Sequence, residues 1–198
     1  MFSIRHAATA AALLCAFAAP SHATVVALAA DAQWNTFNVS DIDAQSFGVE
    51  WIDNANTLSP DFGTPLEFTF TIGAGFKGVL TVVDAGFAGD TFKLTDFSNA
   101  LGNTSGVPAQ SVDTAFYIGT DFDAALADPA FSQGVFEFGA GSYRIGGMLD
   151  QSVSLDGQPL NSTVGALKLS VVAVPEPSTW LVLAAGLGAL GLVSRRRR

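Results

Sequence analysis

Between residues 24 and 174 the chain alternates apolar and polar positions in short runs, separated by Gly, Asp, Asn and Pro. The clearest run is Leu66–Ile72, in which every second residue is apolar. A period of two places those side chains on one face of a β-strand. The same pattern predicts strands at Val25–Leu28, Gln33–Val39, Val49–Ile52, Leu66–Ile72, Gly78–Val83, Thr91–Leu94, Thr114–Ile118, Val135–Phe138, Ser142–Met148 and Leu167–Ala173.

One short helix interrupts this pattern, at Asp123–Ala127. Asp121 or Asp123 can cap its N-terminus, and Pro129 would end it. Turn residues between the strands favour antiparallel pairing, and no internal repeat is present. The sequence therefore predicts an all-β fold, an antiparallel two-sheet sandwich of jelly-roll type with one short helix.

The middle of the chain, between residues 80 and 145, contains four distinctive blocks. They read DAGFAGDTFKL from Asp84, LGNTS from Leu101, DFDAALADPAFSQG from Asp121 and GAGSY from Gly139. These blocks resemble a largely uncharacterised group of secreted bacterial and fungal proteins. The resemblance implies a β-sandwich rather than an activity. Tyr143 stands where many of those relatives have His, so no histidine-dependent role is implied.

The N-terminal segment Met1–Ala23 has the features of an export signal. Arg5 provides a basic start, Ala7–Ala19 is apolar, and small residues precede a cleavage site between Ala23 and Thr24. We expect a signal helix at residues 1–23 that signal peptidase removes, so that the mature protein begins at Thr24. An uncleaved N-terminal anchor is the alternative, which the short apolar stretch disfavours.

The C-terminal segment, residues 174–198, begins with Pro175, Glu176 and Pro177. Proline lacks a backbone donor and restricts the residue before it, so neither a helix nor a strand can continue through this triplet. The triplet is expected to be an extended segment that a protease could grip.

After the triplet comes an apolar run at residues 179–194, and then Arg195, Arg196, Arg197 and Arg198. We expect a transmembrane helix over 179–194, although it is shorter than the roughly 20 apolar residues of a comfortable span. The arginines should stay cytoplasmic, which places the preceding domain on the far side of the membrane. A permanent C-terminal anchor or a buried apolar helix is the alternative.

In this order, the triplet, the apolar run and the arginines resemble the PEP-CTERM sorting tail of Gram-negative bacteria. Such tails are also labelled ice-binding protein C-terminal domains, which implies no binding of ice. The resemblance implies that an exosortase, a membrane cysteine protease, cuts near residues 175–177. The expected organisation is a signal peptide at 1–23, a secreted passenger at 24–173 and a sorting tail at 174–198.

The charge of the passenger is strongly negative. Lys77, Lys93, Arg144 and Lys168 are its basic residues, because Arg5 and the four C-terminal arginines lie in the two ends. With Glu176 assigned to the tail, 17 acidic residues remain and the formal net charge is −13. Nucleic acid and anionic membrane surfaces are therefore poor partners, whereas cations and a hydrated extracellular matrix are suitable ones.

Cysteine and histidine are confined to the signal segment, as Cys15, His6 and His22. A mature passenger without them has no disulfide, no Cys or Ser–His nucleophile and no zinc site of the usual ligand type. Carboxylate chemistry remains, either a glycosidase-type acid pair or an oxygen-ligated Ca²⁺ ion.

Acidic residues gather in three predicted loop regions: Asp41 and Asp43; Asp84, Asp90 and Asp96; Asp121 and Asp123. Asp90, Asp121 and Asp123 are the best candidates for a Ca²⁺ site, because loop carboxylates and carbonyls suit this ion. The alternative is that these residues only form turns and caps. No other cofactor is expected.

Trp34, Tyr117 and Tyr143 are candidates for stacking on sugar rings, whereas Trp51 is expected in the core. The sequence thus favours a non-enzymatic cell-surface or biofilm-matrix protein with a structural or interaction role, for which extracellular polysaccharide is an expected partner. A Ca²⁺-assisted carbohydrate-binding module is the first alternative, and a carboxylate-based glycoside hydrolase is the second. Its processing partners would be signal peptidase and exosortase, with transient insertion in the inner membrane.

Overall fold

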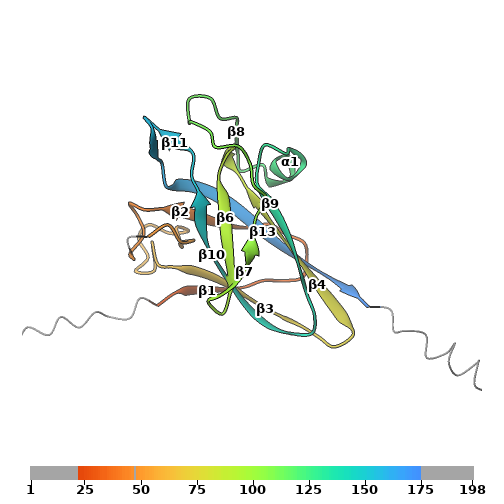
Figure 1. Cartoon of the computed structure of the whole chain (residues 1–198). Coiled ribbons are helices and arrows are strands. Elements are labelled where there is room, and N and C mark those ends of the chain that lie inside the picture. The colour runs from red at the N-terminus through yellow and green to blue at the C-terminus, as the bar shows by residue number, and fades with distance from the viewer. Residues whose placement is uncertain (1–21, 47, 175–198) are drawn as a thin grey trace, which may run out of the picture.

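The computed structural model describes residues 22–46 and 48–174, which form a body made mainly of β-strands (Figure 1). The expected signal helix, apart from residues 22 and 23, and the expected transmembrane helix at 179–194 lie outside the described residues. The elements in the described part are β1 (Thr24–Ala27), β2 (Asn35–Ser40), β3 (Leu66–Ile72), β4 (Phe76–Asp84), β5 (Gly86–Phe87), β6 (Thr91–Asp96), β7 (Asn99–Asn103), β8 (Tyr117–Gly119), α1 (Phe122–Ala127), β9 (Gln133–Phe138), β10 (Gly141–Gln151), β11 (Ser154–Leu155), β12 (Gln158–Pro159) and β13 (Ser162–Ala173).

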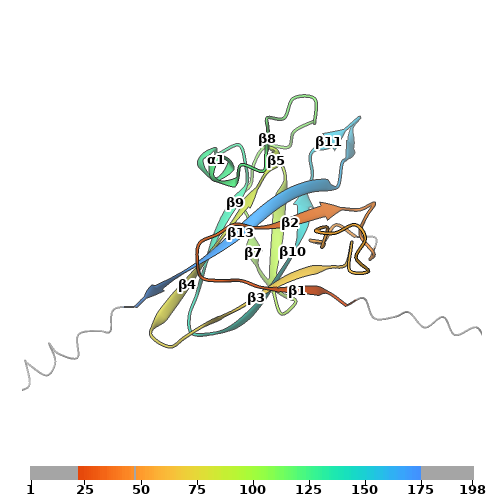
Figure 2. The same ribbon diagram turned by 180° about the vertical axis from the view of Figure 1, so that it is seen from behind.

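Two larger sheets make up this body. One has the strand order β1-β3-β10-β6-β7 and the other has the order β2-β13-β4-β9. The small sheets β5-β8 and β11-β12 lie with α1 at one end of the molecule (Figures 1 and 2). Strand β1 runs parallel to β3, and the other strand pairs described are antiparallel.

The pairing of the main strands is that of a jelly roll. Strand β2 pairs with β13, β3 with β10, β4 with β9, and β6 with β7. These nested pairs arise when one long hairpin, with its turn between β6 and β7, wraps around itself so that successive pairs fall in alternate sheets. The prediction of an all-β sandwich of jelly-roll type is confirmed.

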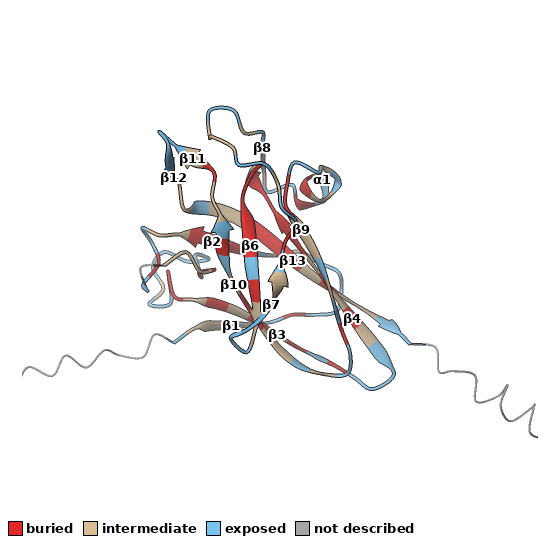
Figure 3. Ribbon diagram, in the orientation of Figure 1, coloured by how far each residue is buried: buried red, intermediate tan, exposed pale blue. Residues whose placement is uncertain are grey.

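The main core lies between the two sheets, where the inward faces of the strands are buried (Figure 3). Strand β3 alternates as the sequence predicts, with Leu66, Phe68, Phe70 and Ile72 buried. At the centre, Phe37 stacks on Trp51 with ring centroids 3.9 Å apart, and Phe92 meets Phe37 edge-on at 5.0 Å. Trp51 is fully buried, as expected.

Two glycines make room for this aromatic cluster. A Cβ atom on Gly147 of β10 would lie closer than 3.0 Å to the indole of Trp51, and one on Gly165 of β13 would lie equally close to the ring of Phe37. Real Cβ atoms essentially never approach so closely. The absence of side chains at these two strand positions is therefore what lets the large rings pack between the sheets.

A second, smaller cluster covers the outer face of the four-stranded sheet. Val83 follows the inward Val82 and therefore points away from the main core, where it packs with Phe122 and Ala125 of α1. The helix begins after Asp121, whose carboxylate accepts a hydrogen bond from the Ala124 N–H at 3.1 Å, and it ends before Pro129. The predicted helix is confirmed, starting one residue earlier than expected.

The segment Val49–Ile52 is not the strand that the pattern predicts. It makes only isolated bridges, from Glu50 to Met148 and from Ile52 to Asn38 and Pro65. Trp51 and Ile52 are adjacent and both fully buried, but only Trp51 belongs to the main core cluster. The segment is instead a loop that inserts Trp51 into the main core.

Candidate functional site

The two ends of the described body lie on opposite sides of the sandwich (Figures 1 and 2). Thr24 is the first residue of β1, and its N–H donates to the Pro65 carbonyl at 2.8 Å. Val174 follows β13 directly, and its N–H donates to the Gly75 carbonyl at 2.9 Å. No linker therefore separates the folded body from Ala23 on one side or from Pro175 on the other.

The remaining residues of the predicted sorting tail lie outside the described part of the chain: Pro175, Glu176, Pro177, the apolar run at 179–194, and Arg195, Arg196, Arg197 and Arg198. Among the residues that are described, no helix has the length and apolar character needed to cross a membrane.

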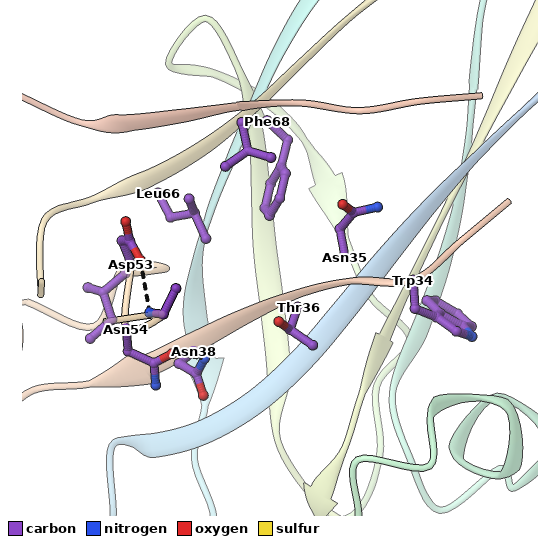
Figure 4. A pocket seen from close by; sticks show the side chains of 11 residues that line it. Trp34, Asn35, Thr36, Asn38, Asp53, Asn54, Leu66 and Phe68 are labelled. Atoms are coloured by element: carbon purple, nitrogen blue, oxygen red, sulfur yellow. Dashed lines mark hydrogen bonds between the residues drawn. The ribbon is translucent and has the colours of Figure 1, made fainter. Parts of the chain in front are cut away.

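A pocket of about 350 Å³ lies along the outer edge of β2 (Figure 4). Asn38 and Asn54 meet at one end of it, where the Asn38 amide donates to the Asn54 side-chain oxygen at 2.6 Å. Asp53 lies beside them and accepts a hydrogen bond from the Ala55 N–H at 3.0 Å. Trp34 lines the opposite end of the pocket (Figure 4). Amide and carboxylate groups next to an aromatic ring can hydrogen-bond and stack with a sugar.

Trp34 is held in place by three contacts. Its indole N–H donates to Asp123 at 3.0 Å, the Lys168 ammonium lies 4.0 Å from the ring centroid, and Phe122 packs at 5.8 Å. The cation over the ring is an attractive interaction, and it occupies one face of the indole. The ring is therefore fixed at the rim of the pocket.

The two tyrosines do not join Trp34. Tyr117 is exposed on β8 and packs against Phe87 with ring centroids 4.8 Å apart. Tyr143 packs between Phe70 and Phe138, and its hydroxyl donates to the Gly139 carbonyl at 3.1 Å. The structure thus places the three predicted sugar-stacking residues in three separate environments.

The predicted metal ligands are also apart. Asp121 caps α1, while Asp123 is exposed and bonds to Trp34 and Lys168. The hydrogen bond from Trp34, with a smaller effect from Lys168, lowers the pKa of Asp123. Asp90 is 1% exposed and lies elsewhere, between the sheets. In the part of the chain that the structure describes, no three His, Cys, Asp or Glu side chains are grouped closely enough to hold a metal ion.

Asp90 has a different acidic neighbour, Asp84, which is 0% exposed. Asp84 ends β4, and its pKa is raised well above the usual value by burial first and by the charge of Asp90 second. Burial also raises the pKa of Asp90 to about 6, although the nearby Thr163 hydroxyl and the Val153 N–H lower it. A glycosidase acid must reach its substrate, and the burial of this pair prevents that contact.

Asp84 belongs to the same predicted loop region as Asp90, but it was not among the predicted metal ligands. The alternation of inward and outward side chains along β4 indicates that Asp84 is buried. Leu80 and Val82 are inward residues of β4, so the next alternate position, Asp84, is also inward. Phe92 and Leu94 of β6 likewise place Asp90 on the inward face.

Comparison with known proteins concerns mainly the tail. Residues 173–198 match the family model of the PEP-CTERM protein-sorting motif, which confirms the expectation drawn from the triplet, the apolar run and the arginines. A solved structure similar to the chain is the pre-peptidase C-terminal domain of a collagenase from Bacillus anthracis, with 12% identity and a TM-score of 0.35 over 77% of this chain and 98% of that one. No curated protein matches the sequence.

Proposed function

We propose that this chain, which carries a PEP-CTERM motif at residues 173–198, is an exosortase substrate whose β-sandwich is delivered to the cell surface or the extracellular matrix. The motif supports export by exosortase-type sorting. Signal peptidase would remove residues 1–23, and the tail would hold the passenger at the inner membrane until the second cut.

The position of the motif carries this proposal. Strand β13 ends at Ala173, where the matched segment begins. The folded body closes at Val174 through its bond to Gly75, and Pro175 comes next. The cleavable triplet therefore follows the last described residue in the sequence, so a cut at residues 175–177 would release the passenger without removing any of the described strands.

Mass spectrometry of the protein isolated from its native host tests the proposal. We expect a mature N-terminus at Thr24 and a C-terminus near residues 175–177 that lacks Arg195–Arg198. Replacing both prolines of the triplet (Pro175→Ala, Pro177→Ala) should leave the tail uncut, whereas the control Pro108→Ala, in an exposed loop, should be processed normally. An unmodified chain that ends at Arg198 on the cell surface would contradict the proposal.

For the passenger itself we propose a structural or interaction role rather than catalysis. Its net charge of −13 favours cations and hydrated polysaccharide as partners and disfavours nucleic acid. The four basic side chains of the described part all form ion pairs, Lys77 with Glu137, Lys93 with Asp150, Arg144 with Glu67 and Lys168 with Asp123. No free basic cluster is therefore available there to bind phosphate groups.

The pocket beside β2 favours a second candidate, binding of a saccharide. Glycan-array binding should be lost in Trp34→Ala and Asn38→Ala, which alter opposite ends of the pocket. Tyr143→Phe is a suitable control, because it removes only a hydroxyl that bonds to Gly139. Binding that persists in EDTA would exclude a metal from recognition, and binding unaffected by both pocket variants would place the sugar elsewhere.

A further inference from the structure

Two buried carboxylates, those of Asp84 and Asp90, lie close together where β4 ends and β6 begins. Asp84 extends the inward face of β4 in the four-stranded sheet, and Asp90 precedes the inward Phe92 of β6 in the five-stranded sheet. Their exposures are 0% and 1%. Figure 3 shows the buried stretches of β4 and β6 at this end of the sandwich. Both acids therefore lie inside the body rather than in a solvent-exposed loop.

Three oxygen atoms of this pair accept no hydrogen bond of normal geometry from the described residues: both Asp84 carboxylate oxygens and Oδ2 of Asp90. The backbone N–H groups of Asp90, Ala85 and Gly89 lie near the Asp84 carboxylate and lower its pKa, but the effect of burial outweighs them. Oδ1 of Asp90 is satisfied by the Val153 N–H at 2.7 Å. Buried polar atoms are nearly always paired, because an unpaired one loses its hydration without compensation. Three buried carboxylate oxygens without a well-formed hydrogen bond at one place therefore point to a missing partner.

That partner is not a basic side chain of the described body. Lys77, Lys93, Arg144 and Lys168 each pair with a carboxylate other than Asp84 and Asp90. Bound protons would remove the negative charge, but a protonated carboxyl still needs an acceptor for its O–H. A cation would compensate both the charge and the unpaired oxygens.

We propose that Asp84 and Asp90 bind a Ca²⁺ ion between the two sheets, at the end of the sandwich where β4 ends and β6 begins. The available ligands are oxygens, which suit a hard cation, and the Thr163 hydroxyl beside Asp90 adds a neutral one. Ca²⁺ fits better than Mg²⁺, because Mg²⁺ usually keeps several waters and demands near-octahedral geometry. Such a site is filled during folding, so the ion becomes part of the fold.

Calcium titration of the full chain in mild detergent tests this site. After dialysis against EGTA at pH 7.5, calorimetry with CaCl₂ should show about one ion bound per chain. CaCl₂ at 100 times the Kd should raise the Tm by roughly 5–10 °C, and EGTA should reverse the rise. MgCl₂ at the same concentration should have a smaller effect.

Substitutions locate the ion. Asp84→Asn and Asp90→Asn, which keep the side-chain shape, should each abolish the Tm rise with CaCl₂. Asp121→Asn is the matched control, because that carboxylate is engaged as the cap of α1, and the variant should keep the full response. If one of the first two variants fails to fold, the other supplies the comparison.

Two results would overturn the proposal. One is the absence of both binding heat and Tm change when CaCl₂ is added to the unmodified chain, which would leave protons as the compensation. The other is a response that Asp84→Asn and Asp90→Asn retain, which would place the ion elsewhere.

Discussion

Between the sheets, Phe37, Trp51 and Phe92 fill one region with packed rings, whereas Asp84 and Asp90 fill a neighbouring region with carboxylates. The two regions adjoin in the sequence, because Asp90 directly precedes β6 and Phe92 is the second residue of that strand. Burial is complete or nearly so in both, yet its consequences are opposite. Rings gain free energy when they leave water, whereas carboxylates lose it unless they are compensated. Equal burial therefore does not mean equal stabilisation.

The largest expected effect is in the aromatic region. Trp51→Ala should lower the free energy of unfolding by about 3–5 kcal/mol, because it removes a fully buried ring and leaves a cavity next to Phe37 and Phe92. Urea denaturation measures this loss. Trp34→Ala is the control, since that ring is only partly buried and should cost less. Equal losses in the two variants would show that the ring cluster is not the centre of stability.

The carboxylate region should respond to pH in the opposite sense to an ordinary ion pair. In EGTA, Asp90 has a pKa of about 6 in the folded state, above its ordinary value of 3.8. Between these two pH values the folded state holds a proton that the unfolded state has released. Stability should therefore fall as the pH rises from about 4 to about 6, by about 3 kcal/mol on account of Asp90 alone.

Comparison with Asp90→Asn isolates this contribution. Without calcium, the variant should equal or exceed the unmodified chain in stability at pH 7.5, and the difference between them should shrink below pH 4. Denaturation curves at several pH values measure it. A difference that does not change with pH would show that Asp90 titrates normally.

A smaller effect is expected from filling the space that Gly147 leaves for Trp51. Gly147→Ala should destabilise by about 1–3 kcal/mol, because the added Cβ overlaps the indole and forces the ring or the strand to shift. Gly146→Ala lies on the same strand and meets Thr95 at 3.3 Å, a milder contact. Thermal unfolding of the pair tests the packing, and a larger loss for Gly146→Ala would contradict it.

The smallest effect is expected at α1, which belongs neither to the aromatic region nor to the carboxylate region. Asp121→Ala removes the cap of α1 and should cost about 1 kcal/mol without changing the calcium response. Asp113→Ala, an exposed loop acid, is the control and should be near neutral. A changed calcium response in Asp121→Ala would mean that the helix and the carboxylate region are coupled.

The sequence predicted the architecture because its strands obey local rules. Leu66–Ile72 was predicted to the residue, since its alternation reflects one buried face. Strand β7 at Asn99–Asn103 was not predicted, because it is a partly exposed edge strand held by pairing with β6 rather than by an apolar pattern. Strand β13 begins at Ser162 rather than at the predicted Leu167, because Ser162–Ala166 are small or polar residues without a clear alternation of large apolar side chains.

The sites were less predictable than the fold. The position of the tail motif follows from the order of residues alone, so local sequence was sufficient. The closeness of Asp84 and Asp90 follows from the short connection between β4 and β6, and the alternation within β4 already placed Asp84 on the inward face. The expected grouping of Asp90 with Asp121 and Asp123 assumed that neighbouring loops meet, whereas Asp121 is engaged as a helix cap.

Strand β13 also determines how the protein would bear mechanical force. It is an inner strand of its sheet, paired to β2 on one side and to β4 on the other, and the tail continues directly from its end. A pull on the tail is directed along the strand, so many hydrogen bonds on both sides must shear together before it yields. Pulling from Thr24 would instead load β1, an edge strand with four paired residues. While the passenger is tethered by its tail, a pulling force therefore acts first on β13, the strand that is paired on both sides.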